Sequence, residues 1–442
     1  MAIKGLDIFK LSPKTNCKEC GSPTCMAFSM KVAQGAVSIE TCPYMSEEAK
    51  ALLSEATAPP MAQLSFGTGD CEYKLGGETV LYRHDKTFVS KNLFGISLCP
   101  CCADSKLEQL AKVDYERIGE RMHVEVLNLP DTGNQEAFLE LVKKSAGKGY
   151  ALILDTKCTD TAAKALEICA SEKPVLNGAT PENVAEMAEL AKKYDVLLGI
   201  SAPDLEALYD TAAAAEAAGW KKLVLDVTGD SIKQTFENAV QVRRGALTDH
   251  NRTFGYPSIV NAAKLAKGDP AMQTAIASVF VLKYGSIIIM EDMSYAQALP
   301  LFGLRQNIFT DPQKPMRVNP GIYPINSADE NSVLVTTVDF ALTYFIVSGE
   351  LERSGVPCNL MISDAGGYSV LTSWAAGKFS AGSISAFIKE QNIEEKYKSR
   401  TLIIPGKVAV LKGELEERLP GWKIVVAPND ATALVKFMKD YQ

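Results

Sequence analysis

Four cysteines near the start of the chain have the spacing of a metal-cluster site. Cys17, Cys20, Cys25 and Cys42 form a C-x2-C-x4-C-x16-C pattern, and Pro43 follows the last of them. Cysteine thiolates are the ligands of iron–sulfur clusters, and a close group followed by a distant fourth ligand lets a short loop and one helix enclose the cluster. The pattern therefore predicts a [4Fe-4S] cluster bound by these four thiolates.

Two disulfides or a structural zinc ion are the other uses of such a cysteine set. The chain opens MAIKGLDIFKL without an apolar signal segment, so we expect a reducing compartment, where structural disulfides are rare. Structural zinc sites usually combine a CxxC pair with a second close pair, whereas here the fourth cysteine is isolated. The cluster is thus the favoured interpretation, and zinc is the alternative that remains.

The other seven cysteines give weaker signals. Cys99, Cys101 and Cys102 lie in LCPCCAD, which could form a second metal site or a redox pair, but no histidine or further cysteine nearby completes a ligand set. A turn of small, buried residues explains the segment equally well. The remaining four are scattered, and we expect them to be core residues without a function: Cys71, Cys158, Cys169 and Cys358.

Length and composition limit the class of protein. With 442 residues, 47% of them hydrophobic, the chain should form two or three domains with cores of their own. No apolar run approaches the roughly 18 residues needed to cross a bilayer. The net charge of −7 and the absence of a basic block argue against nucleic acid as a partner. We therefore expect a cytoplasmic protein.

A small cluster domain at 1–57 is followed by a segment rich in proline and glycine at 58–85, which predicts a linker containing one hairpin. Between 86 and 313, eight β-rich runs alternate with alanine-rich helical stretches, and this alternation predicts an eight-fold β/α (TIM) barrel. The runs are Thr87–Ser90, His123–Leu129, Ala151–Asp155, Pro174–Asn177, Val196–Ser201, Lys222–Val227, Arg252–Tyr256 and Ser286–Glu291.

Polar residues stand at the ends of several of these runs, where barrel sites form: Asn128, Asp155, Asn177, Ser201 and Asp226. They could bind a pterin. Polar residues at strand ends also start loops and cap helices, and the region has no clear acid–base pair or metal-binding set. We therefore favour a structural role for these residues. Otherwise they belong to the remnant of a former active site or to a surface that binds a partner.

The region 319–442 alternates strand and helix again. Val333–Val338, Asn359–Ser363, Arg400–Pro405 and the run KIVVAP predict an open parallel sheet of flavodoxin type. Ligands of such sheets bind beyond the carboxyl ends of the strands. Gly366 and Gly367 open a helix at one of these ends, which would let a ligand approach the backbone amides closely. The segments 405–406 and 427–433 stand at the ends of later strands.

The order of these parts, together with the segments VTTVDFALT and SDAGGYSVLTSWAAGKFSA, resembles the large (gamma) subunit of the corrinoid iron–sulfur protein of the reductive acetyl-CoA (Wood–Ljungdahl) pathway. The resemblance covers the whole chain. It implies a corrinoid on the C-terminal domain. The positions that match the family's cofactor contacts are Thr337, Thr343, Gly366, Gly367, Tyr368, Ser369, Val370 and Ala433.

Many corrinoid proteins ligate cobalt through a histidine in a D-x-H-x-x-G motif, but here no histidine follows His250. The C-terminal domain therefore cannot ligate cobalt through imidazole, and the corrinoid that the resemblance implies is expected to be base-off. An axial nitrogen stabilises Co(II) and Co(III), so its absence makes Co(I) easier to reach.

The resemblance implies a methyl carrier that acts as a methyltransferase component, in which the cobalt rather than a side chain is the nucleophile. Co(I) would accept a methyl group from methyltetrahydrofolate through a separate methyltransferase and deliver it to acetyl-CoA synthase/CO dehydrogenase. The [4Fe-4S] cluster, fed by a ferredoxin-type reductant, would reactivate Co(II), and a small subunit would complete a heterodimer. Two alternatives remain: an iron–sulfur reactivator of another corrinoid protein, and a pterin-binding barrel methyltransferase.

Overall fold

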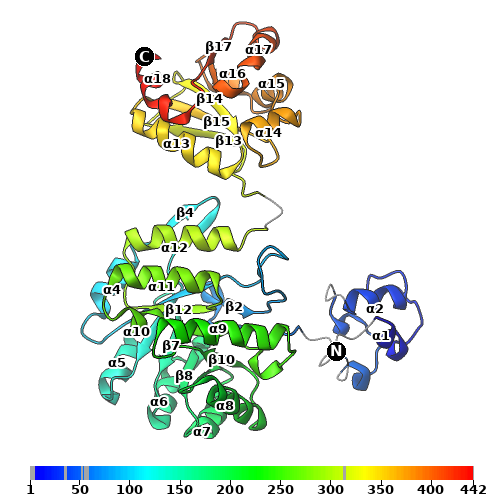
Figure 1. Cartoon of the computed structure of the whole chain (residues 1–442), viewed down its shortest axis with the longest axis vertical. Helices are drawn as coiled ribbons and strands as arrows, with labels where there is room; N and C mark the ends of the chain where they lie inside the picture. The colour runs from blue at the N-terminus through cyan, green and yellow to red at the C-terminus, as the bar shows by residue number, and fades with distance from the viewer. Residues whose placement is uncertain (1–4, 34–36, 51–52, 54–58, 312–314, 442) are drawn as a thin grey trace. The chain divides into compact units, whose positions relative to one another are not determined.

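The computed structural model describes residues 5–33, 37–50, 53, 59–311 and 315–441. The chain divides into two compact units. The first contains residues 1–114 and 122–309, and the second contains residues 115–121 and 310–442 (Figure 1). Across the described residues, no helix has both the length and the apolar character needed to cross a bilayer.

The cysteine-rich segment forms a small helical fold with its own core. Helices α1 (Gly5–Leu11) and α2 (Cys25–Ala33) precede a short helix, η1 (Ile39–Thr41). Gly5 lets α1 approach α2 closely, because a Cβ atom at this position would lie 2.4 Å from the sulfur of Met30. The core residues include Ile8, Phe28, Val32, Ile39, Cys42, Met45 and Leu53.

A hairpin follows within the segment predicted as a linker. Strands β1 (Gln63–Phe66) and β2 (Tyr73–Gly76) pair antiparallel, which confirms the predicted hairpin. Phe66 and Leu75 are fully buried in one core with apolar residues of the barrel strands. Gly67 also donates its N–H to the carbonyl of Lys173 at 2.9 Å. This part of the segment is therefore packed against the barrel.

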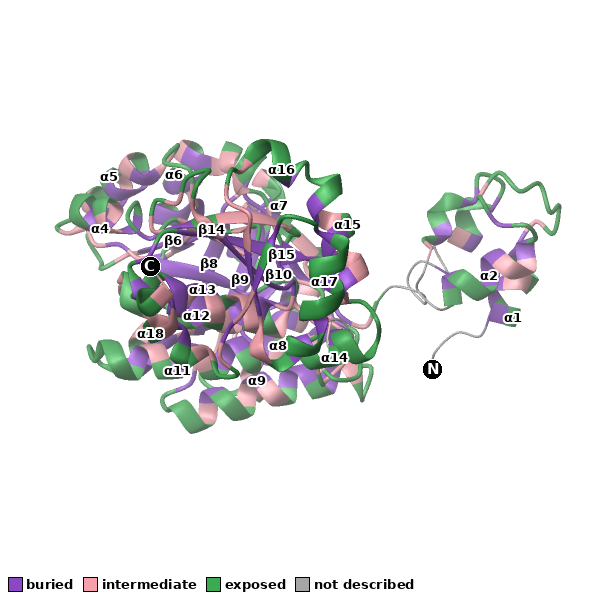
Figure 2. Cartoon of the chain, turned by 90° about the horizontal axis from the view of Figure 1, so that it is seen from above, coloured by how far each residue is buried: buried purple, intermediate pink, exposed green. Residues whose placement is uncertain are grey.

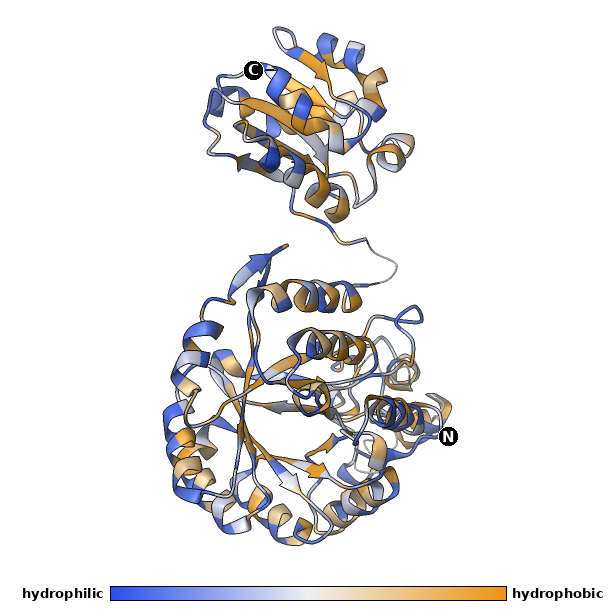
Figure 3. Cartoon of the chain, turned by 60° about the vertical axis from the view of Figure 1, so that its left-hand side comes forward, coloured by the Kyte–Doolittle hydropathy of each residue, from blue (hydrophilic) through white to orange (hydrophobic). Residues whose placement is uncertain are grey.

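Eight parallel strands close into a barrel in the order β10-β11-β12-β3-β6-β7-β8-β9, which confirms the predicted eight-fold barrel. The strands are buried, and the helices around them expose hydrophilic faces (Figures 2 and 3). The strands are β3 (Leu93–Ser97), β6 (Val126–Pro130), β7 (Ala151–Asp155), β8 (Val175–Ala179), β9 (Leu197–Ser201), β10 (Leu223–Asp226), β11 (Ser258–Asn261) and β12 (Ile287–Met290).

The main helices of the barrel are α4 (Ala103–Leu110), α5 (Gln135–Ser145), α6 (Thr159–Cys169), α7 (Val184–Tyr194), α8 (Leu205–Ala217), α9 (Ile232–Leu247), α10 (Ala262–Ala266), α11 (Pro270–Leu282) and α12 (Tyr295–Ile308). A two-stranded hairpin of β4 (Tyr115–Arg117) and β5 (Glu120–Met122) interrupts the connection between β3 and β6.

Two of the predicted barrel runs are wrong. Thr87–Ser90 is not a strand: the N–H groups of Val89 and Ser90 donate to the buried carboxylate of Glu78 instead of to a neighbouring strand, and β3 begins only at Leu93. Arg252–Tyr256 contains the short helix η4 (Arg252–Phe254), which Asn251 caps, and β11 begins at Ser258. In both places a side chain captures the backbone donors that a strand would need.

The second unit contains a five-stranded sheet in the order β13-β15-β14-β16-β17. Its strands are β13 (Gly321–Ile325), β14 (Val333–Val338), β15 (Cys358–Ser363), β16 (Thr401–Ile404) and β17 (Lys423–Val426). All neighbours are parallel except β13, which pairs antiparallel with β15. The sequence prediction missed β13, whose Pro324 cannot donate to a ladder and suits an edge strand.

Helices cover both faces of this sheet. Apolar side chains of α13 (Ala341–Ser354) and α18 (Leu434–Tyr441) share one core with the sheet, and those of α15 (Ala381–Glu390) and α17 (Lys412–Arg418) share the other. Two shorter helices are α14 (Val370–Ala375) and α16 (Ile393–Lys396). From β14 the chain proceeds to β15 on one side, whereas β16 and β17 lie on the other side. The strand order therefore reverses between β14 and β16, the place where open α/β sheets bind ligands.

The scattered cysteines differ in their burial. Cys169 and Cys358 are core residues as predicted, and burial raises the pKa of their thiols to about 12 and about 11. Cys71 is half-buried and Cys158 is exposed. The prediction of a core position is therefore wrong for Cys158, which precedes α6 on a surface loop.

Candidate functional site

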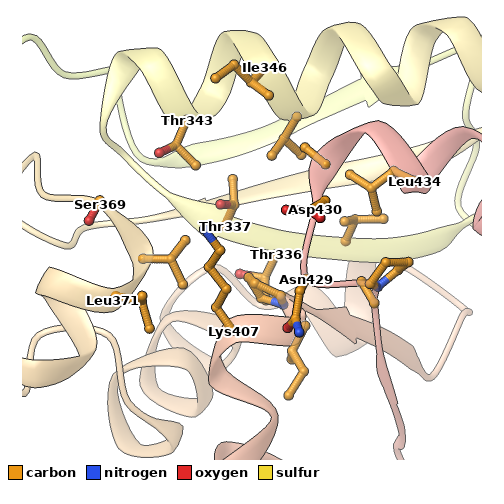
Figure 4. Close-up of a pocket in the computed structure, with 18 residues that line it drawn as sticks. Thr336, Thr337, Thr343, Ile346, Ser369, Leu371, Lys407, Asn429, Asp430 and Leu434 are labelled. Atoms are coloured by element: carbon orange, nitrogen blue, oxygen red, sulfur yellow. The ribbon is translucent and has the colours of Figure 1, made fainter.

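A pocket opens where the strand order of the C-terminal sheet reverses. Its volume is about 290 Å³. The C-terminal part of β14, the ends of β16 and β17 with the loops that follow them, one side of α13 and the start of α14 line it. Figure 4 shows side chains from these elements around a common space. The labelled residues are Thr336, Thr337, Thr343, Ile346, Ser369, Leu371, Lys407, Asn429, Asp430 and Leu434.

Two threonine hydroxyls in this pocket have no hydrogen-bond partner. Thr336 and Thr337 are each 1% exposed, and no atom of the described structure pairs with either Oγ1. A buried hydroxyl without a partner costs about 1 to 3 kcal/mol. Apolar side chains such as Ile346 and Leu434 form much of the remaining wall, and Lys407 and Asp430 bring opposite charges to it. An apolar pocket with a few polar groups is typical of a cofactor site.

The loop after β15 is fixed by one buried carboxylate. Asp339 is fully buried, and its Oδ1 accepts the N–H groups of Ala365 at 3.0 Å and Gly367 at 2.9 Å. Its Oδ2 accepts from Nε of Arg317 at 2.6 Å. Gly366 and Gly367 have φ of +73° and +76°, which only glycine adopts readily. Asp339 thus holds the glycine loop in a single conformation.

The first three cysteines lie in and beside a loop with repeated left-handed backbone. Lys14, Asn16, Lys18 and Gly21 have φ between 49° and 72°. Left-handed residues interspersed in a loop are a feature of the backbone N–H concavities that bind anions and iron–sulfur clusters. Asn16 donates its N–H to Sγ of Cys25 at 3.4 Å, and its Oδ1 accepts the N–H of Cys25 at 2.8 Å.

Packing brings the distant fourth cysteine to the same loop. The hydroxyl of Tyr44 donates to Glu19 at 2.9 Å, and this contact raises the pKa of Tyr44. Cys20 packs against the core that contains Cys42. A cluster bound by these four cysteines stays a prediction at this point.

The sequence model of the family described as CO dehydrogenase/acetyl-CoA synthase delta subunit matches residues 63–438. A second model, described as an Fe-S cluster, matches residues 13–44. The corrinoid/iron-sulfur protein large subunit of Moorella thermoacetica is 36% identical over 445 residues, which cover 99% of each chain. The chain belongs to the corrinoid iron–sulfur protein large-subunit family.

Archaeal relatives extend this similarity. The acetyl-CoA decarbonylase/synthase complex subunit gamma of Archaeoglobus fulgidus is 34% identical, over 98% of this chain and 97% of its own. The subunit of the same description from Methanothermobacter thermautotrophicus is 30% identical, over 99% of both chains. The family resemblance that the motifs indicated is thereby confirmed along the whole chain.

The corrinoid contacts inferred from this family divide into two groups. Thr337, Thr343, Ser369 and Val370 line the pocket, and Ser369 also caps α14. The others are not among the residues that line it: Gly366, Gly367, Tyr368 and Ala433. Contact of any of these residues with a corrinoid stays a prediction. Asn429 and Asp430 lie in the segment 427–433, which the sequence marked as a strand end without naming these two residues. Lys407 lies just past the predicted end at 405–406 and was missed, although it stands in the loop after β16, where ligands of such sheets bind.

Apolar side chains at this end of the domain are unusually exposed. Ile346 and Leu371 line the pocket and are 47% and 46% exposed. Tyr368 and Trp374, from the loop and helix that carry Leu371, are 41% and 40% exposed. Exposed apolar groups that gather beside a pocket mark a binding surface for a large ligand or a partner.

The polar residues at the barrel strand ends form a hydrogen-bonded group. Nδ2 of Asn177 donates to Asp155 at 3.0 Å, and Nδ2 of Asn128 donates to Ser97 at 3.1 Å. Burial raises the pKa of Asp155 and raises that of Asp226 to about 6. The side-chain oxygens of both asparagines are buried without a partner in the described structure.

Gly199 makes room for Asn177, because a Cβ atom there would lie 2.2 Å from its Oδ1. Four of the five predicted strand-end residues thus come together, namely Asn128, Asp155, Asn177 and Asp226, whereas no hydrogen bond joins Ser201 to them among the described contacts. Their hydrogen bonds agree with the structural role favoured from the sequence, and a pterin ligand stays an untested alternative.

Proposed function

We propose that this chain is the large subunit of a methyl carrier of the acetyl-CoA pathway, with a [4Fe-4S] cluster in its N-terminal segment and a base-off corrinoid on its C-terminal domain. The pocket at the reversal of strand order, with two unpartnered threonine hydroxyls, carries this proposal beyond family membership. When bound, the corrinoid supplies a cobalt that takes up a methyl group as Co(I) and gives it to acetyl-CoA synthase, and the cluster supplies the electron that restores Co(I) from Co(II).

The residues present fit a cluster. Cys17, Cys20, Cys25 and Cys42 supply four thiolates, and no other ligand type is needed. Backbone N–H groups of the loop that contains Lys14, Asn16 and Lys18 would stabilise the negative charge of a thiolate-bound cluster. Cys17 is exposed whereas Cys25 and Cys42 are buried, so an electron would enter from the Cys17 side.

The residues present also fit a corrinoid. The hydroxyls of Thr336 and Thr337 would donate to acceptor groups at the edge of the macrocycle, and Lys407 would pair with a negative group such as a phosphate. Ile346 and Leu371 would contact its apolar face. The absence of histidine after His250 means that this domain offers no imidazole to cobalt, so a base-off cofactor would have no nitrogen ligand from a histidine of this domain.

The exposed apolar rim supports a partner on the remaining face of the cofactor. Tyr368 and Trp374 are too exposed to be core residues, and their burial by a small subunit would exclude water from the cobalt. The methyltetrahydrofolate methyltransferase and acetyl-CoA synthase would then need access to the same surface in turn, which requires movement of the corrinoid-carrying domain.

Electron paramagnetic resonance tests the proposal. The chain is coexpressed with its small subunit, purified without oxygen, and measured before and after reduction by dithionite. We expect cobalt hyperfine lines without nitrogen splitting, together with the signal of a reduced cubane cluster. A cluster signal without cobalt, after a cobamide has been supplied, would contradict the methyl-carrier function and favour an iron–sulfur reactivator of another corrinoid protein.

A further inference from the structure

Three cysteine sulfurs converge at the end of barrel strand β3, away from the four N-terminal cysteines in sequence. Cys99, Cys101 and Cys102 form a group whose sulfurs all lie within 4.8 Å of one another, the one such group of metal-ligating side chains in the described structure. The sulfurs of Cys99 and Cys101 are 2.9 Å apart, and a disulfide joins Cys99 to Cys102. The sequence alone did not establish that all three point to one place.

The backbone around these sulfurs is a tight turn that leads into a helix. Cys102 donates its N–H to the carbonyl of Cys99 at 3.1 Å, with Pro100 at the second position of the turn. The N–H of Cys99 in turn donates to Sγ of Cys102 at 3.3 Å. Helix α4 begins at the next residue, Ala103. An N–H donor and a helix N-terminus both stabilise a thiolate over a thiol.

A buried lysine fixes the position of this turn. Nζ of Lys106, one turn into α4, donates to the carbonyls of Ser97 at 2.9 Å and Glu291 at 2.6 Å, and to the carboxylate of Glu291 at 2.7 Å. These contacts tie α4 to the ends of β3 and β12. The three sulfurs are thus presented from a rigid support, which metal sites need.

The disulfide between Cys99 and Cys102 involves two of the three sulfurs and does not explain why the exposed Cys101 lies beside them. In the reduced form all three would be free thiols within reach of one ion, and the exposure of Cys101 would leave a fourth position open to solvent. Three protein ligands with an open position are typical of reactive rather than structural zinc sites. Thiolates select thiophilic ions such as Zn²⁺ or Cu⁺ over Mg²⁺ and Ca²⁺.

We propose that reduced Cys99, Cys101 and Cys102 bind one thiophilic metal ion, for which Zn²⁺ is the test ion. Reduction by a water-soluble phosphine converts the disulfide into two thiols, while water supplies the oxygen of the phosphine oxide. Binding then forms three zinc–sulfur bonds and releases the three thiol protons to the buffer. The oxidised form keeps a single free thiol and does not bind the ion.

The test compares zinc retention by the full chain, purified without oxygen and reduced with the phosphine. Each protein is dialysed against zinc with a competing chelator, and zinc per chain is measured by mass spectrometry. The wild type should retain one more zinc than Cys99→Ser, Cys101→Ser or Cys102→Ser. The loss of affinity should exceed the roughly 10- to 100-fold that removal of an outer-shell partner causes. The matched control Cys158→Ser, an exposed cysteine on another barrel loop, should bind like the wild type.

Because every variant keeps the four N-terminal cysteines, zinc bound there cancels in the comparison. Cys101 is exposed, so Cys101→Ser leaves the fold intact and is the decisive variant. X-ray absorption at the zinc edge should show three sulfur neighbours at about 2.3 Å. Equal zinc in the wild type and Cys101→Ser would overturn the proposal and leave Cys99 and Cys102 as a simple redox pair.

Discussion

Replacement of Asp339 by alanine should lower the free energy of unfolding of the C-terminal domain by several kcal/mol, because this buried carboxylate accepts two backbone hydrogen bonds. The substitution leaves the buried N–H groups of Ala365 and Gly367 without an acceptor. A hydrogen bond to a charged group contributes about 1.5 to 3 kcal/mol, so the two bonds together contribute about 3 to 6 kcal/mol. Arg317 is 43% exposed and adds about 1 kcal/mol or less. The total is a large part of the stability of one domain, about 5 to 15 kcal/mol.

Urea unfolding followed by tryptophan fluorescence measures this loss. Two of the three tryptophans, Trp374 and Trp422, lie in the C-terminal domain, so a Trp220→Phe background restricts the signal to that domain. The expected result is a lower midpoint for Asp339→Ala without a change in slope. Asp339→Asn keeps one acceptor oxygen for the two N–H groups but places an amide nitrogen against Arg317, so it loses the charge and that ion pair and should cost about 1 to 2 kcal/mol.

The matched control is Asp364→Ala, which removes the other carboxylate that pairs with Arg317. Its side chain is 67% exposed and accepts one N–H, from Gly366 at 3.1 Å. An exposed ion pair contributes about 1 kcal/mol at most. If Asp339→Ala is no less stable than Asp364→Ala, the view that a buried carboxylate holds the glycine loop is refuted.

Three further substitutions test the other sites. Thr337→Val removes a hydroxyl without a partner, so stability should not fall, whereas corrinoid affinity, measured by cobalt retention, should fall about 2- to 10-fold; unchanged affinity would contradict the proposed contact. Cys20→Ala should abolish reductive reactivation but spare methylation of a corrinoid reduced beforehand, and loss of both activities would contradict the division of labour. Burial raises the pKa of Asp226 from 3.8 to about 6 in the folded protein, so stability should fall by at most about 3 kcal/mol as pH rises through this range. Asp226→Asn should flatten that fall in urea unfolding, unlike the exposed control Asp230→Asn.

The sequence predicted the elements whose signal is local. Strand β7 occupies the predicted residues Ala151–Asp155, because a buried parallel strand reads as a short apolar run. The sequence prediction failed where a side chain outside the apolar run decides whether the run forms a strand. Val89 and Ser90 have strand-like neighbours, yet Glu78 takes their N–H groups. Nothing in the local pattern reveals that competitor, which lies 11 and 12 residues earlier.

In the pocket, too, local sequence patterns predicted some of the lining residues, whereas others are brought there only by the tertiary fold. The prediction that ligands bind beyond the strand ends came from a local pattern, and Thr337 and Val370 do line the pocket there. Lys407 and Asp430 join them only because β16 lies beside β14 in the sheet and β17 lies beside β16. The sequence order of strands does not give their spatial order, which depends on how the helices pack on each face.

The sequence by itself determined the four-cysteine pattern, the alternation of strands and helices in both α/β regions, the lack of a C-terminal histidine and the family. Each depends on residue type and spacing along the chain. The tertiary structure decided which strand ends adjoin, that Asp339 fixes the glycine loop, and that three cysteine sulfurs converge after β3. The first two features arise from contacts between residues far apart in sequence, and the third arises from a backbone turn that packing stabilises. Because these contacts, with their burial and hydrogen bonds, exist only in the folded chain, the sequence pattern does not reveal them.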